Sequence, residues 1–212
     1  PDPSLFRVWS PPPRSIDRDA IWESSYPLTA AARAAQSAWD PLTDNPVINC
    51  VGKGMPSIMN PPYPMDFVDR GDVIVYRQEE FDSVRTLYMD PTATPAPEPS
   101  NMGHSVGRWE GETLVVNSNN FNDKIHFNGS SEALHVVERF TRVDDETIRY
   151  EFTVEDPTAW GQSWTAQFPL MKRDGPLYEY ACHEGNYDIR HILEVARNLD
   201  EGQLEARQNP NE

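Results

Sequence analysis

Hydrophobic and polar residues alternate one by one through much of the second half of the chain. The hydrophobic positions of one such run are Ile148, Tyr150, Phe152 and Val154. Those of a second run are Trp164, Ala166, Phe168 and Leu170. A period of two places these side chains on one face of an extended strand, so the pattern predicts half-buried antiparallel strands.

Short polar turns separate the strands at regular spacing. From Met65 onward, "DRGD" and "EEFD" mark hairpin loops, and Gly111 marks another between Trp109 and Thr113. Short strands joined in this way form a meander that closes into a barrel or folds as a sandwich. We expect a mainly β fold, with a single antiparallel meander β-barrel of the lipocalin-like kind over residues 66–182.

The regions on either side of the predicted barrel have different patterns. Residues 1–65 are rich in breakers and predict an irregular wrapping segment with one helix at about 29–39, capped by Thr29 and stopped by Pro41. Residues 186–200 place hydrophobic residues on one helical face, which predicts a C-terminal helix packed across a barrel end or a sheet edge. The 212 residues are enough for one domain, 1–212, rather than two.

Charge narrows the choice of partner. The formal net charge is −16, which disfavours nucleic acids and anionic membrane surfaces because both are bound through clustered Lys and Arg. No window approaches the ~20 apolar residues of a membrane span, so no membrane insertion is expected. The sequence starts without Met, which leads us to expect a removed signal peptide and a periplasmic or secreted protein.

The two cysteines, Cys50 and Cys182, leave two alternatives open. They form one disulfide, which an exported location favours, or they are two separate buried thiols. Two cysteines are too few for a zinc site made of thiolates.

Glu138 is the strongest candidate for chemistry. In "LHVVERFTRV" a period of two puts Glu138 on the same face as Leu134, Val136 and Phe140. If that face points into the barrel, burial disfavours the charged carboxylate and raises its pKa toward that of a general acid or base. The alternative is that Glu138 pairs with an interior Arg or lies at the barrel rim.

Histidines supply the possible partners of Glu138. His104 precedes a strand at a predicted barrel mouth and is the expected proton-transfer partner, with His135 or His183 as a second donor. Glu184 is a further candidate in "YACHEGNYDIRH". If this stretch is a strand, Glu184 and His183 lie on opposite faces of it. A metal site built from these His and Glu side chains is an alternative, although their spacing matches no diagnostic metal motif.

Aromatic residues are plentiful enough to line a cavity. The candidates for contacting a ligand are Tyr150, Trp109, Trp164, Tyr180 and Phe140. Such a lining would hold an apolar or aromatic small molecule, oriented by a few polar groups. The alternative is that these rings only fill the core.

Several longer motifs carry a family resemblance. "NPPYPMDFVDRGD", "GHSVGRWEGETLVV", "NFNDK", "ALHVVERF" and "YACHEGNY" resemble a family of uncharacterised, exported bacterial proteins. The resemblance runs from about Asp40 to Arg197. It implies export and assigns no catalytic residue, and the likeness to lipocalins is one of fold alone.

These observations favour a protein that binds a small apolar or aromatic molecule in its barrel and performs acid/base chemistry on it without an organic cofactor. Elimination or isomerisation is favoured over hydrolysis. One alternative is a binding protein of the cell envelope without catalysis. Two others are a metal-dependent enzyme and an interaction module with no pocket.

Overall fold

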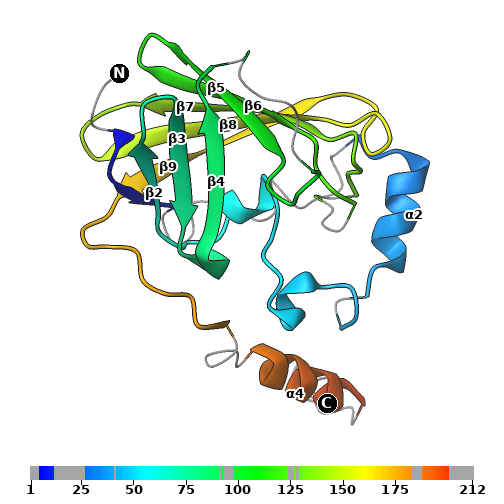
Figure 1. Cartoon of the computed structure of the whole chain (residues 1–212). Helices are drawn as coiled ribbons and strands as arrows, with labels where there is room; N and C mark the ends of the chain where they lie inside the picture. Colours follow the sequence, from blue (N-terminus) through cyan, green and yellow to red (C-terminus); the bar gives the residue numbers. More distant parts are fainter. Residues whose placement is uncertain are drawn as a thin grey trace, which may run out of the picture.

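The protein is a closed β-barrel with short helices outside it (Figure 1). The computed structural model describes residues 5–11, 27–40, 42–90, 92, 98–123, 127, 129–182 and 188–200. In these residues the barrel strands are β1 (Val8–Ser10), β2 (Met65–Asp69), β3 (Val73–Gln78), β4 (Ser83–Tyr88), β5 (His104–Glu110), β6 (Thr113–Asn119), β7 (His135–Arg142), β8 (Thr147–Glu155) and β9 (Trp164–Lys172). The predicted fold class, a mainly β protein with a lipocalin-like barrel, is therefore confirmed.

Neighbours in the barrel are neighbours in the chain, as in a meander. The pairing is antiparallel throughout except between β4 and β5, where Leu87 lies opposite Ser105 in a parallel ladder. Parallel strands cannot be joined by a tight turn. The long connection between β4 and β5 makes this pairing possible and is the one departure from the predicted antiparallel order.

The N-terminal segment does more than wrap the barrel. Its strand β1 pairs with both β2 and β9 and so closes the barrel. The short helix η3 (Ser57–Met59) buries Ile58 and Met59 completely, and the Ile58 carbonyl accepts a hydrogen bond from Gln78 Nε2 at 2.8 Å. The expected boundary at residue 65, between wrapper and barrel, is therefore too simple.

The helices agree well with the sequence pattern. Helix α2 (Ala30–Ala38) begins after Thr29, whose Oγ1 accepts a hydrogen bond from Ala32 N at 3.1 Å. Two 3₁₀ turns, η2 (Pro46–Asn49) and η4 (Glu80–Asp82), lie beside the barrel. Helix α4 (Asp188–Asp200) forms where predicted, but Figure 1 shows it apart from the sheet rather than across a barrel end.

The alternation of Tyr178, Tyr180 and Cys182 predicts a last barrel strand from Leu177 onward, but residues 177–182 form no strand. Strand β9 already pairs with β8 on one side and β1 on the other, so no sheet edge remains for another strand. The Tyr178 and Tyr180 amides instead donate to the carboxylates of Glu79 and Asp82, at 3.1 and 3.4 Å. Among the described residues, no helix is long and apolar enough to cross a membrane.

Large side chains occupy the barrel interior. The biggest of those that are fully buried are Trp9, Trp160, Tyr76, Tyr150, Phe67 and Phe140. Several pack edge to face, with Phe67 and Phe140 at 5.1 Å between ring centroids. The interior is a packed hydrophobic core with a few polar groups inside it.

Candidate functional site

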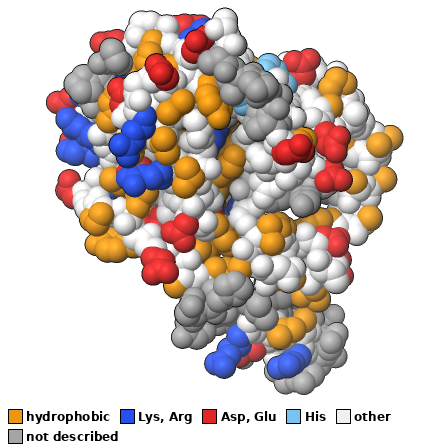
Figure 2. All heavy atoms as spheres, in the orientation of Figure 1, with side chains coloured by type: hydrophobic (Ala, Val, Ile, Leu, Met, Phe, Trp, Pro, Cys, Tyr) orange, Lys and Arg blue, Asp and Glu red, His pale blue; other side chains and the backbone are white. Residues whose placement is uncertain are grey.

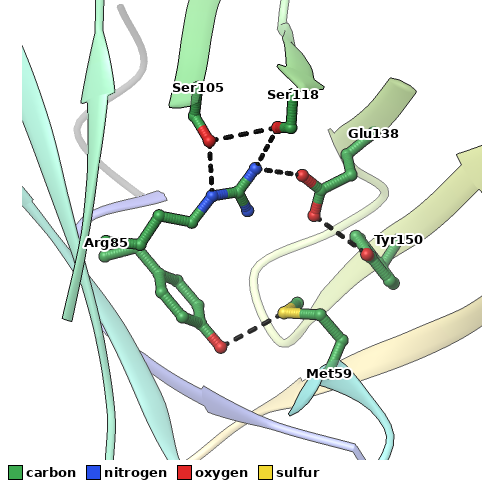
Figure 3. Close-up of polar contacts among 7 residues, drawn as sticks. Met59, Arg85, Ser105, Ser118, Glu138 and Tyr150 are labelled. Atoms are coloured by element: carbon green, nitrogen blue, oxygen red, sulfur yellow. Dashed lines mark hydrogen bonds and ion pairs between the residues drawn. The ribbon is translucent and has the colours of Figure 1, made fainter. Parts of the chain in front are cut away.

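The polar groups of the core form one connected cluster around Arg85 and Glu138 (Figure 3). Arg85 Nη2 lies 2.5 Å from Glu138 Oε2, and both side chains are almost completely buried. The guanidinium also donates to Ser118 Oγ at 2.6 Å through Nη2 and to Ser105 Oγ at 2.7 Å through Nε. The other carboxylate oxygen, Glu138 Oε1, accepts from the Tyr150 hydroxyl at 2.9 Å.

This cluster pairs each charge with an opposite one. Burial raises the pKa of the Tyr150 hydroxyl, and the Glu138 carboxylate raises it further, so Tyr150 stays protonated and donates. A buried pair with satisfied hydrogen bonds is stable as a unit, but the loss of one partner leaves an uncompensated charge. Glu138 therefore points into the barrel as predicted. Of the alternatives given by the sequence, it is the one in which Glu138 pairs with an interior Arg. A catalytic role of Glu138 stays a prediction.

His104 and His135 do not join Glu138. On β5 the inward residues are Ser105 and Gly107, so His104 lies on the opposite face of the sheet, with its ring 5.1 Å from that of Tyr88. Its Nδ1 is buried without a hydrogen-bond partner among the described residues. His135 alternates with the buried Val136 and likewise faces outward.

The remaining predicted residues have different locations. His183 and Glu184 lie outside the described residues. Tyr150 and Phe140 are fully buried in the core with ring centroids 4.9 Å apart. Trp109 and Trp164 are partly buried against the core, and Tyr180 lies outside the barrel.

The site around Tyr180 is a groove on the outside of the barrel, with a volume of about 500 Å³. Four chain segments build this groove, and their lining residues define it. These are Cys50, Gly52, Lys53, Phe81, Asp82, Ser83, Val84, Asn101, Met102, Glu179, Tyr180, Ala181 and Cys182. In Figure 1 the orange segment after β9 passes below the lower end of β4. The turn between β3 and β4 lies at that end and also lines the groove.

A disulfide joins two segments that are far apart in the sequence at this groove. Cys50 and Cys182 are bonded, with their Cα atoms 5.9 Å apart and a sequence separation of 132. Of the two alternatives left open by the sequence, the disulfide is the one present. The bond holds the segment after β9 against the segment around Cys50, so two walls of the groove come from segments far apart in the sequence.

Aromatic rings form one wall of the groove. Tyr180 packs against Phe81 with centroids 4.7 Å apart and against Tyr63 at 5.3 Å, edge to face. Val84, at the start of β4, adds an aliphatic side chain that is 57% exposed. The groove therefore offers a few apolar side chains among polar ones to a molecule of small size.

The backbone of the groove is held in an unusual conformation. Four non-glycine residues of the described chain have positive φ, and three of them, Cys50 (52°), Phe81 (58°) and Asp82 (46°), line the groove. This left-handed region is costly for a bulky residue such as Phe. Gly52 allows the close approach there, because a Cβ at that position would lie 3.2 Å from Phe81 Cβ.

A buried carboxyl group lies directly behind the groove lining. Lys53 Nζ donates to Glu80 Oε1 at 2.8 Å, while Glu80 Oε2 is buried without a hydrogen-bond partner in the described part of the chain. Burial raises the pKa of Glu80 above its ordinary value, and the neighbouring Lys53 only partly offsets this effect. Strained backbone and a carboxyl of perturbed pKa beside a groove are features of functional sites.

Comparisons with other proteins leave the family open. No protein-family model matches this chain, and no curated protein matches its sequence. The resemblance to exported bacterial proteins therefore stays a prediction. In the described residues there is no group of three or more His, Cys, Asp or Glu side chains placed to hold a metal ion.

Sequence reasoning missed most of the groove. Tyr180 and the two cysteines were singled out, but Phe81, Asp82 and Lys53 were not. Only "EEFD" between two strands marked a turn there, and nothing in those letters shows a left-handed Phe. Arg85 could have been found, because it shares one strand face with Leu87 in "SVRTLY".

Proposed function

We propose that the protein binds a small molecule with an aromatic or apolar body in the groove beside the Cys50–Cys182 disulfide. The observation that carries the proposal is the left-handed backbone of Phe81 and Asp82 in the groove lining. Such a conformation costs about 1–2 kcal/mol per residue and persists only where the surrounding structure enforces it. It turns the Phe81 ring toward that of Tyr180.

The groove suits a ligand better than the barrel interior does. Fully buried rings such as Tyr76 and Tyr150 occupy the interior, and Met59 lies against the Tyr76 hydroxyl at 3.1 Å. On the face drawn in Figure 2, hydrophobic side chains are scattered among polar and charged ones rather than gathered into a broad patch. A broad protein interface is therefore less well supported on this face than a small-molecule site.

An exported location fits this function. A disulfide is compatible with an oxidising compartment, such as the periplasm or the exterior of the cell, and would be reduced in most cytosols. The groove depends on that bond for one of its walls. We therefore assign the binding function to a periplasmic or secreted protein.

A pair of variants tests the binding site. Val84 and Val143 are equally exposed, at 57% and 58%, but only Val84 lines the groove. A set of aromatic fragments is screened against the ¹⁵N-labelled protein, and amide shifts are followed by NMR. We expect fragments that shift groove amides, with binding weakened at least tenfold by Val84→Lys and unchanged by Val143→Lys. Equal binding by wild type and Val84→Lys would contradict the proposal.

Proton transfer to the bound molecule is a second candidate function. It is favoured by the raised pKa of Glu80, which makes this carboxyl a usable acid or base directly behind the groove lining. A bound fragment with an acidic C–H would exchange that hydrogen with D₂O faster than the free fragment. Loss of this exchange in Glu80→Gln, but not in the exposed control Glu112→Gln, would support Glu80, and unchanged exchange in Glu80→Gln would contradict this role.

A further inference from the structure

Charged side chains at the groove define the kind of ligand it takes. Its charged lining residues are Lys53, Asp82 and Glu179. Lys53 is already paired with Glu80 at 2.8 Å, so its positive charge is balanced within the protein. The carboxylates of Asp82 and Glu179 remain, on residues that are both exposed.

Carboxylate oxygens at the groove accept few hydrogen bonds from the described residues. In the described part of the chain, Asp82 Oδ1 accepts one long bond of 3.4 Å, from the Tyr180 amide. The Glu80 side chain is 97% buried, and its Oε2 accepts no hydrogen bond from the described part of the chain. Ionised carboxylates can accept but cannot donate. A ligand that supplies donors is therefore favoured beside the Asp82 carboxylate.

The aromatic wall favours the same kind of ligand. The faces of Tyr and Phe rings attract cations, and the two rings in the groove lining, Tyr180 and Phe81, pack against each other. An anionic ligand would meet two carboxylates, with the local cation already paired. Acidic side chains are spread over the face drawn in Figure 2, and the net charge of −16 draws cations toward the whole protein.

We propose that the groove binds an organic cation, a protonated amine on an aromatic or apolar body, with the ammonium near Asp82 and the body against Phe81 and Tyr180. This proposal rests on the binding function proposed above and adds the charge of the ligand. The Asp82 carboxylate would accept from the ammonium, and the rings would contact the apolar part. Asp82 is then a recognition residue as well as a strained one.

Three compounds of similar size and different charge test the proposal. Benzylammonium, benzyl alcohol and benzoate are titrated into the wild-type protein, with amide shifts at the groove as the readout. We expect benzylammonium to bind about three- to tenfold more tightly than benzyl alcohol, and benzoate to bind most weakly. Asp82→Asn, which tolerates the same backbone conformation, should remove most of that preference and leave benzyl alcohol binding unchanged.

The control is Glu112→Gln, which removes one negative charge from an exposed residue outside the groove lining. It should leave the preference for benzylammonium intact. If all three compounds bind the groove equally, or if Asp82→Asn keeps the preference, the cation proposal is wrong and the binding function stands. If none of the three shifts groove amides, both proposals are overturned.

Discussion

The rings of Phe81 and Tyr180 lie 4.7 Å apart, although one residue belongs to the β3–β4 turn and the other follows the last barrel strand. This contact exists because the Cys50–Cys182 disulfide and the hydrogen bonds donated by the Tyr178 and Tyr180 amides hold the segment after β9 against the barrel. The binding surface is therefore assembled outside the barrel, and the barrel interior serves as the core.

The first prediction concerns the disulfide. In the chain-entropy model, a bond that closes a loop of 132 residues contributes about 4–5 kcal/mol. The double variant Cys50→Ala/Cys182→Ala should have a free energy of unfolding lower by about 2–5 kcal/mol, measured by urea denaturation, and should lose groove binding. The wild type under reducing conditions should match the variant. An oxidised wild type no more stable than the variant would show that the bond is absent in solution.

The second prediction concerns the buried ion pair. Glu138→Gln leaves the Arg85 charge uncompensated inside the core and should lower the free energy of unfolding by about 3–5 kcal/mol. The double variant Arg85→Met/Glu138→Leu should cost far less than the sum of Arg85→Met and Glu138→Leu made singly. Denaturant unfolding of the wild type, these two single variants and the double variant measures the coupling.

The exposed pair Arg108 and Glu110 provides the control for that cycle. Glu110→Gln should change stability little, because water screens this pair. If Glu138→Gln is also nearly neutral, the Arg85–Glu138 pair does not carry the structural role described above.

The sequence pattern predicted the interior of the barrel better than its closure. Strict alternation on β7 placed Glu138 inward, and Gly111 marked its hairpin correctly. Strand β1 was missed because three residues are too short to show a period. Residues 177–182 alternate as a strand would, with Tyr178 and Tyr180 on one face. They form no strand because β9 already pairs with β1 and leaves no free sheet edge.

The groove could not have been derived in the same way. It depends on four segments that meet only in the folded chain, and on a disulfide that the sequence left open. Left-handed backbone at Phe81 is imposed by its surroundings and opposes the local preference of a bulky residue. Local patterns therefore indicated the strands and their faces, but not where they leave a surface hollow.

The third prediction tests the strain at Phe81. Because its φ is 58°, Phe81→Gly should be more stable than Phe81→Ala by about 1 kcal/mol. At Val84, which lies in an extended strand, the order should reverse, with Ala more stable than Gly by about 0.5–1 kcal/mol. Thermal or urea unfolding of the four variants gives both differences. The same order at both positions would show that Phe81 is not held in the left-handed region.

The fourth prediction follows from the raised pKa of Glu80, which burial causes. The folded protein holds the Glu80 proton more tightly than the unfolded chain does. The resulting stabilisation is fully present below the unfolded pKa of about 4.3 and is lost as pH rises through the raised folded value. Stability measured from pH 4 upward should therefore fall more in the wild type than in Glu80→Gln. Parallel curves for the two proteins would contradict a raised pKa.

Ligand binding in the groove is tested most directly by a crystal structure of the protein soaked with the same set of aromatic fragments, without choosing a site in advance. We expect bound fragments in the groove, in contact with Phe81 and Tyr180 beside the Cys50–Cys182 disulfide. Fragments bound instead inside the barrel, against Glu138 and Tyr150, would contradict this expectation.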